Sequence, residues 1–237
     1  DGTIPETAII REVRLLFIDQ GEADKALAKN ATTQREIRAD SKTKPVEMIM
    51  QVYNAGHRDF GENKVQELTA KQKLLPEDIR WHLIGHLQTN KVKFIAPFIY
   101  MIQSVDSLKL LAEINKEAAK NNRVIDCLLQ FHIATEETKF GLSMAEAEEI
   151  LHDPRIKELK NVRICGVMGM ATFTNNESLI NREFRTLKSI FTDLKKKYFA
   201  GDPGFCEISM GMSGDYKLAI AAGSTIVRIG SLIFGER

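Results

Sequence analysis

The sequence has little cysteine, no excess of charge of either sign and no long apolar run, and each shortage excludes a class of protein. Three cysteines occur in 237 residues, far apart and without a Cys-x-x-Cys pair. We therefore expect buried thiols in a reducing cytoplasm rather than disulfides or a structural zinc site. The net charge is +1 with both signs interspersed, which argues against nucleic acid or an anionic membrane as partner. No apolar stretch reaches the about 20 residues that span a bilayer.

The sequence predicts neither a metal site nor a leader segment. His82 and His86 lie close together, but they flank a strand-then-turn pattern, so they do not share one helical face. We expect no metal site there. The first residues, DGTIPETAIIREVRLLFID, lack a basic segment followed by an apolar core, and we do not expect a signal peptide.

Short apolar runs alternate with amphipathic stretches along the chain. The amphipathic stretches begin and end with helix signals, such as Pro45 and Gly56 around one, and Ser107 or Ser143 at the start of two others. The expected helices cover residues 45–56, 107–122, 143–153 and 176–199. The expected strands are residues 36–40, 58–62, 80–85, 98–105, 124–133, 162–170, 206–211 and 225–230.

Strands that alternate with helices predict parallel βαβ units. Eight such units in a chain of this length predict an α/β fold, a single (β/α)₈ TIM-type barrel; an open, doubly wound sheet is the alternative. We expect one domain over residues 1–237, with the barrel in residues 36–237. Residues 1–35 are predicted to form one or two helices packed outside it.

The unusual residues of the sequence follow the expected strands, where the active sites of such barrels lie. Lys42 follows the first strand, Asn63 the second and His86 the third, and Met168 and Met170 end the sixth. The loops after the last two strands combine glycine with serine, with Ser209, Gly211 and Ser213 in one. Arg228, Gly230 and Ser231 lie at the other.

Glycine and serine in these two loops predict a phosphate site, because backbone N–H groups and hydroxyls there can bind the anion. A phosphate at one place and a lysine at the first strand suit an aldehyde cofactor that carries a phosphate. Simpler roles remain open. Lys42 and Lys44 could be solvated cations, Met168 a core residue, Asn63 a helix cap, and Arg228 half of a buried ion pair with Glu207.

Five segments, taken together, resemble the pyridoxal 5′-phosphate (PLP) homeostasis proteins, the YggS/PROSC family. They occur in order from residue 41 to the C-terminus: SKTKP, AGHRDFGENKVQE, WHLIGHLQTNK, ICGVMGMAT and EISMGMSGDYKLAIAAGSTIVRIGSLIFGER. The resemblance implies a barrel like the N-terminal domain of alanine racemase, with PLP as cofactor.

The resemblance also assigns roles to single residues. It implies a Schiff base between PLP and Lys42, with Lys44 at the surface. Ser209, Gly230 and Ser231 would hold the phosphate, and Arg228 would face the pyridine nitrogen and keep it unprotonated. Three further residues would line the ring, namely Asn63, His86 and Met168. One departure is local: Arg38 and Asp40 precede Ser41 where the family has an apolar strand.

The family implies a cytoplasmic, monomeric, non-catalytic protein that stores or delivers PLP, with PLP-dependent apoenzymes as candidate partners. The chain ends soon after the last expected strand, so we do not expect the second domain that supplies the other base of a two-base racemase. Two alternatives remain. One is a small PLP-dependent racemase or lyase with Lys42 as its base. The other is a phosphate-ligand isomerase without PLP, which would use Glu62 as its base.

Overall fold

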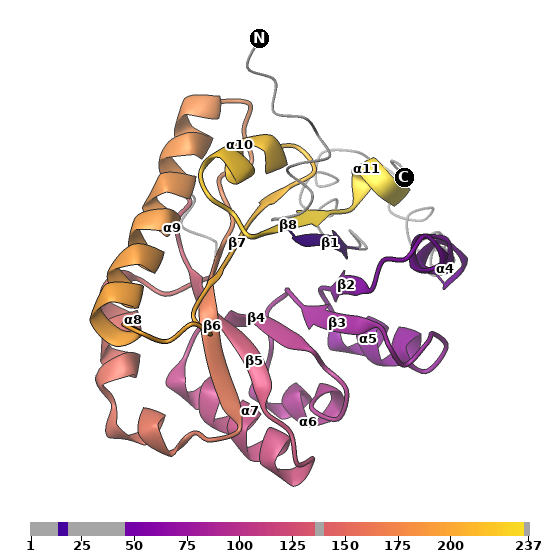
Figure 1. Ribbon diagram of the computed structural model, residues 1–237, viewed down its shortest axis with the longest axis horizontal. Helices are drawn as coiled ribbons and strands as arrows, with labels where there is room; N and C mark the ends of the chain where they lie inside the picture. Colours follow the sequence, from indigo (N-terminus) through magenta and orange to yellow (C-terminus); the bar gives the residue numbers. More distant parts are fainter. Residues whose placement is uncertain (1–13, 19–45, 136–139, 235–237) are drawn as a thin grey trace, which may run out of the picture.

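The strands close into a parallel barrel in sequence order. A computed structural model describes residues 14–18, by their backbone, and residues 46–135 and 140–234. Figure 1 shows the strands inside a layer of helices. The strands are β1 (Arg14–Ile18), β2 (Asp59–Glu62), β3 (Arg80–Leu83), β4 (Met101–Val105), β5 (Ile125–Phe131), β6 (Val162–Gly169), β7 (Glu207–Met212) and β8 (Ile226–Ile229). The predicted TIM-type barrel is thereby confirmed.

Helices follow the strands and pack on the outside of the barrel. Among the described residues, none of them is long and apolar enough to cross a membrane. They are α4 (Val46–Asn54), α5 (Val65–Gln72), η2 (Thr89–Lys91), α6 (Val92–Ile95), α7 (Leu108–Lys120), α8 (Met144–His152), η3 (Pro154–Glu158), α9 (Glu177–Tyr198), α10 (Tyr216–Ala221) and α11 (Ser231–Phe234).

The first strand does not lie where the sequence pattern placed it. β1 is formed by Arg14–Ile18 and pairs with β2 and β8, with Phe17 opposite both Phe60 and Ile229. The expectation of a helix outside the barrel is wrong for these five residues. The run RLLFI is short and apolar, and periodicity alone cannot distinguish a buried strand from a helix in such a run. The predicted strand at residues 36–40 lies outside the described residues.

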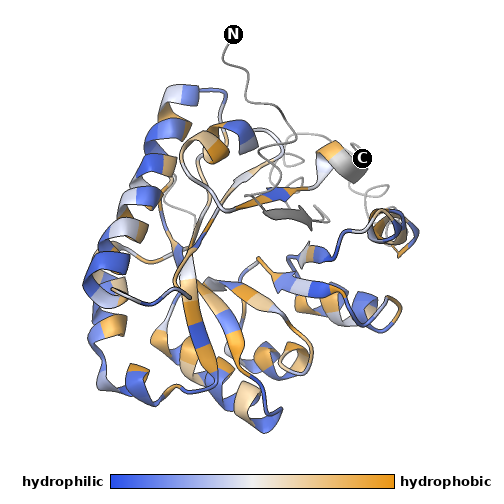
Figure 2. Ribbon diagram, in the orientation of Figure 1, coloured by the Kyte–Doolittle hydropathy of each residue, from blue (hydrophilic) through white to orange (hydrophobic). Residues whose placement is uncertain are grey.

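Side chains of the strands alternate between two apolar layers, as extended backbone requires. On β5, Cys127 and Leu129 belong to the large core between strands and helices, whereas Leu128 belongs to a smaller cluster. The smaller cluster also contains Met101 and Met168 from neighbouring strands. In Figure 2 hydrophobic residues predominate on strands such as β4 and β6, while β2 and β3 carry hydrophilic ones and the outer faces of the helices are largely hydrophilic. Burial on both faces explains the near-continuous apolar runs of the sequence.

Two of the predicted helix starts are confirmed in detail. The hydroxyl of Ser107 accepts a hydrogen bond from the backbone N–H of Leu110 at 3.3 Å. Ser143 and Glu146 form a reciprocal capping box at the start of α8. Such caps satisfy N–H groups that have no partner within the helix.

Helix α9 holds the loops that follow β5 and β6. Its Glu183 is buried and accepts hydrogen bonds from the backbone N–H of Thr135 at 3.1 Å and of Thr172 at 2.7 Å. The hydroxyl of Thr172 donates to the same carboxylate at 2.7 Å. Charge-assisted bonds of this kind are roughly twice as strong as neutral ones. One carboxylate thus fixes two loops at the carboxyl ends of the strands.

A second buried carboxylate, Asp59 at the start of β2, joins β2 to β3. It accepts hydrogen bonds from Arg80 Nη2 at 2.5 Å and from His82 Nε2 at 3.1 Å. Burial by itself would raise the pKa of Asp59, but the hydrogen bonds from His82 and Arg80 lower it from 3.8 to about 2. The folded state therefore favours the ionised carboxylate.

We expect Asp59→Asn to lower the free energy of unfolding at pH 7 by about 2 kcal/mol, the free energy that corresponds to this pKa shift. Because the folded pKa is depressed, the stabilisation is fully present above the unfolded value of 3.8 and is lost as the pH falls to about 2. Urea unfolding of both proteins from pH 7 downward measures the difference. A difference that stays constant across this acid range would contradict the assignment.

Candidate functional site

A cavity of about 670 Å³ opens at the carboxyl ends of the strands. Ligand sites of barrels lie at this end, and the volume suits a small molecule. Its wall comes from β8, from the end of β7, from the loops after β2, β3 and β6, and from the first turn of α5 and the end of η2. The residues that line it are Asn63, Lys64, Val65, Gln66, Glu67, Ile84, Gly85, His86, Gln88, Lys91, Met170, Met212 and Arg228.

Strand β8 contributes a charged residue, Arg228, to the wall of the cavity. The residue is 1% exposed, and its guanidinium donates to Ser209 Oγ at 2.8 Å and to the carbonyl of Gly169 at 3.0 Å. Burial lowers the pKa of Arg228 to about 10, against the opposing effect of the Asp215 charge. The side chain therefore stays cationic at neutral pH. Since a guanidinium has five N–H donors, donors remain for a ligand.

An ion pair between Arg228 and Glu207, the alternative left open for this arginine, is not among the contacts of the described residues. Glu207 Oε2 instead accepts a hydrogen bond from the hydroxyl of Thr225 at 2.7 Å. The guanidinium of Arg228 thus donates hydrogen bonds to a hydroxyl and a carbonyl at the cavity wall. A buried cation in such surroundings is costly unless something else compensates it, which makes this wall suited to an electron-rich or anionic ligand atom.

Asn63 and His86, which the resemblance assigns to the PLP ring, both line the cavity. A Cβ atom on Gly85 would lie 2.2 Å from the carbonyl oxygen of Asn63, so the close approach of these two loops requires glycine. His86 stacks on Phe140 with ring centroids 4.8 Å apart, and its Nδ1 lies 3.4 Å from Asp106 Oδ2. The imidazole is therefore held between the loops after β3, β4 and β5.

Met168 does not line the cavity, although the family resemblance places it at the ring; it has the core position that was the simpler alternative. It is fully buried in the smaller cluster, below the cavity, and Met170 takes the place at the wall. Met170 lies just past the end of β6 and packs against the same smaller cluster as Met168, so both methionines lie on one side of the chain, with Met170 nearer the cavity. The one nearer the carboxyl end of the strand reaches the ligand side.

A similar displacement affects the serine expected to bind phosphate. Ser209 is 0% exposed, and its hydroxyl donates to Gln103 Oε1 at 2.6 Å while it accepts from Arg228. Ser213, one residue beyond Met212, accepts a hydrogen bond from the N–H of Gly230 at 3.2 Å. The structure therefore brings Ser213 to Gly230 and the adjoining Ser231, and leaves Ser209 among buried groups.

An irregularity in β7 explains why the sequence does not show which serine of this strand lies nearer the cavity. The register between β7 and β8 shifts between Ser209 and Met212, so that Met212 lies opposite Arg228. Gly211 has a φ of +94°, and a Cβ atom there would lie 2.5 Å from Ala219 Cβ. Such a bulge re-aims the side chains that follow it, and here it turns the end of β7 toward β8.

Other residues named by the sequence analysis lie away from the cavity or outside the described part. Lys42 and Lys44 belong to residues 19–45, which the structure does not describe. Glu62, the base that an isomerase would need, is 1% exposed and forms an ion pair of 2.5 Å with Lys71 of α5. His82 contacts Asp59 and Gln103 inside the barrel rather than His86.

Comparison with known sequences identifies relatives over most of the chain. Residues 25–237 match the family described as alanine racemase, N-terminal domain. The pyridoxal phosphate homeostasis protein of Aquifex aeolicus is 41% identical over 198 residues, which cover 83% of this chain and 85% of that protein. The human protein of the same name is 39% identical over 216 residues, covering 86% of this chain and 77% of its own.

Solved structures agree with this relationship. PipY of Synechococcus elongatus, in a structure with PLP bound, has a TM-score of 0.75 and 29% identity, covering 99% of this chain and 95% of its own. Alanine racemase from Bartonella henselae has a TM-score of 0.65 at 18% identity and shares the fold, this chain covering 58% of its length. The resemblance found in the sequence is confirmed, and the chain belongs to the pyridoxal phosphate homeostasis proteins of the alanine racemase N-terminal domain family.

Proposed function

We propose that this protein binds PLP in the cavity at the carboxyl ends of the strands, joined covalently to Lys42, and serves in PLP homeostasis and delivery without robust turnover. The observation that carries the proposal is the buried, cationic Arg228 at the wall of this cavity. The bound PLP of the PipY structure and the names of the relatives support the same ligand.

The ring end of the site would be formed by Arg228. Its N–H groups can only donate, so they pair with a pyridine nitrogen that carries a lone pair and no proton. Protonation of that nitrogen beside a fixed cation is unfavourable. Asn63, His86 and Met170 form the wall around this position and would fix the plane of the ring.

The phosphate end would be formed where β7 and β8 end. Ser213 and Ser231 offer hydroxyls, and the backbone N–H of Gly230 donates to the Ser213 oxygen, which positions that hydroxyl to give its own proton to a phosphate oxygen. Hydroxyl and N–H donors bind phosphate oxygens without adding a further charge. We assign the phosphate to Ser213, Gly230 and Ser231, and we withdraw Ser209 from this role because Gln103 and Arg228 occupy its hydroxyl.

The same residues argue for storage rather than catalysis. When bound, PLP supplies an electron-withdrawing ring, and that ring withdraws electrons less well when its nitrogen is unprotonated. Arg228 therefore restrains the chemistry that a PLP enzyme depends on. We further propose that the protein acts as a cytoplasmic monomer and passes PLP to apoenzymes. A small racemase or lyase, with Lys42 as base, is the competing function.

A titration with PLP, followed by absorption and gel filtration, tests the proposal. We expect Ser213→Ala to raise the dissociation constant about tenfold, because it removes one hydrogen bond to a charged group. Ser189→Ala is the matched control, since Ser189 lies on α9 with an exposed hydroxyl 3.5 Å from Asp193. If the wild-type protein retains no PLP, the proposed function is wrong. If both variants bind alike, the phosphate assignment is wrong.

A further inference from the structure

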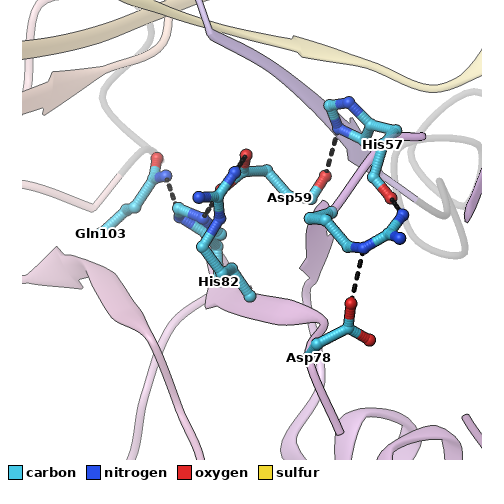
Figure 3. A network of polar contacts seen from close by, with 7 residues as sticks. His57, Asp59, Asp78, His82 and Gln103 are labelled. Carbon is cyan, nitrogen blue, oxygen red and sulfur yellow. Dashed lines mark hydrogen bonds and ion pairs between the residues drawn. The ribbon is translucent and has the colours of Figure 1, made fainter. Parts of the chain in front are cut away.

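A row of buried polar side chains crosses the interior of the barrel and ends at the guanidinium of the cavity. We call it the interior chain, and its members are Arg228, Ser209, Gln103, His82 and Asp59. Each is at most 6% exposed. Successive donor and acceptor atoms lie 2.8, 2.6, 3.2 and 3.1 Å apart. Figure 3 shows the part of it that runs from Gln103 through His82 to Asp59.

The direction of every hydrogen bond in the interior chain follows from its two ends. The guanidinium of Arg228 can only donate, so Ser209 Oγ accepts from it and gives its own proton to Gln103 Oε1. The amide nitrogen of Gln103 then donates to His82 Nδ1, which leaves the imidazole proton on Nε2. That proton goes to the Asp59 carboxylate, which can only accept.

The reverse arrangement fails at two places. If the Gln103 amide were turned round, its oxygen would face His82 Nδ1, which would then need a proton of its own. The amide nitrogen would face Ser209 Oγ, and the Ser209 proton would lose the acceptor that the structure gives it. A buried hydroxyl without an acceptor costs about 1–3 kcal/mol. One orientation therefore satisfies all five side chains, and it joins a buried cation to a buried anion.

At the end of the interior chain farthest from the cavity, Asp59 is also hydrogen-bonded to residues that do not belong to the interior chain. Asp59 also accepts from Arg80 Nη2 at 2.5 Å, and the backbone carbonyl of Asp59 contacts His57 Nε2 at 2.7 Å. The pKa of Asp59 is about 2, so this end is negative at neutral pH. Hydrogen bonds in series polarise one another in a low dielectric, and the orientation set at Asp59 is thus transmitted toward Arg228.

We propose that the interior chain positions Arg228 for the pyridine ring and helps to hold its charge in the barrel, so that Ser209, Gln103 and His82 are positioning residues although they do not line the cavity. The proposal rests on the proposed function. It explains why strands β3, β4 and β7 each have a polar side chain at a core position, where an apolar residue would avoid the free-energy cost of desolvating a polar group. The same arrangement gives Ser209 a role other than phosphate binding.

Removal of the Ser209 hydroxyl is the direct test. Ser209→Ala should raise the PLP dissociation constant about tenfold and shift the visible absorption band of the bound cofactor. The matched control is Ser224→Ala. Ser224 is also buried between β7 and β8, but its hydroxyl contacts the backbone carbonyls of Ile208, Met210 and Ile226. This variant should leave the band unchanged. Equal effects of the two variants, or wild-type binding by Ser209→Ala, would overturn the proposal.

Nitrogen NMR of the cofactor-free protein provides a readout that does not depend on PLP. At neutral pH the wild-type His82 should carry its proton on Nε2, and Gln103→Leu should change the balance between the two tautomers. A wild-type His82 protonated on Nδ1 would refute the orientation of the chain even if a variant failed to fold. The failures are distinguishable: a wild type that binds no PLP refutes the proposed function, whereas a PLP-binding wild type with an unaffected Ser209→Ala refutes this inference alone.

Discussion

Lys42→Ala is expected to abolish the covalent attachment of PLP, whereas Lys44→Ala should leave it intact. A lysine amine condenses with an aldehyde, with loss of water, when its surroundings favour the neutral amine. Of the pair in SKTKP, the resemblance assigns this role to Lys42, which follows Ser41 directly. The wild-type protein with PLP should show a visible band at ~420 nm, the usual region of a protonated lysine Schiff base. The Lys42→Ala protein should lack this band.

Chemical trapping separates attachment from simple binding. Borohydride reduction of the PLP-loaded protein, followed by peptide mass spectrometry, should place the cofactor on the peptide that contains Lys42. Lys44→Ala is the matched control, because it removes the same charge two residues away. The described residues of the cavity wall are unchanged in both variants, so Lys42→Ala should still bind PLP, but weakly and reversibly. A cofactor trapped on Lys64 or Lys91, the lysines of the described cavity wall, would contradict the assignment.

The sequence predicts the barrel from β2 to β8 well, because local signals and burial agree there. Continuous apolar runs indicate strands buried on both faces, and Ser107 and Ser143 show where two helices start. The first strand was missed because RLLFI carries no signal that separates a strand from a helix. Its pairing with β2 and β8 is decided by closure of the barrel, which local sequence does not encode.

The site was predicted by region but not always by residue. Asn63, His86 and Arg228 reach the cavity as expected, because each stands near the end of a strand. How deep each side chain lies inside the barrel could not be predicted from the sequence. Met170, just past the end of β6, lines the cavity in place of Met168, and after the register shift of β7 Ser213 rather than Ser209 contacts Gly230. A bulge changes which side chain reaches the ligand, and its position depends on the partner strand.

The interior chain was also missed, although it left a signal in the sequence. Gln103 interrupts an apolar run of β4, His82 stands between Trp81 and Leu83, and Ser209 lies within an apolar stretch of β7. Each polar residue alone could be an exception in a strand. Only the barrel brings these strands together around one axis, so that residues far apart in the chain become hydrogen-bond partners.

Arg228→Glu is expected to give the PLP-loaded protein an amino-acid turnover that the wild type restrains. A carboxylate at this position would accept a hydrogen bond from the N–H of a protonated pyridine nitrogen and so favour the protonated ring, the reverse of what the guanidinium does. A protonated ring withdraws electrons more strongly. We therefore expect exchange of the α-proton of L-alanine for deuterium, followed by NMR, to rise about tenfold or more, since one pKa unit of ring protonation is worth about tenfold. Arg228→Gln removes the cation without adding a carboxylate and should lie between the two.

Both substitutions also remove the hydrogen bonds from Arg228 to Ser209 and to the carbonyl of Gly169. Thermal unfolding and PLP titration of each variant must therefore accompany the exchange rates, so that rates are compared at equal occupancy. A folded, PLP-loaded Arg228→Glu protein that exchanges no faster than the wild type would show that Arg228 is not what restrains catalysis. In contrast, a wild type that already turns over amino acids persistently would favour the racemase or lyase, with Lys42 as its base. The exchange rates of these variants therefore test whether the charge at this one buried position of β8 separates a carrier from an enzyme.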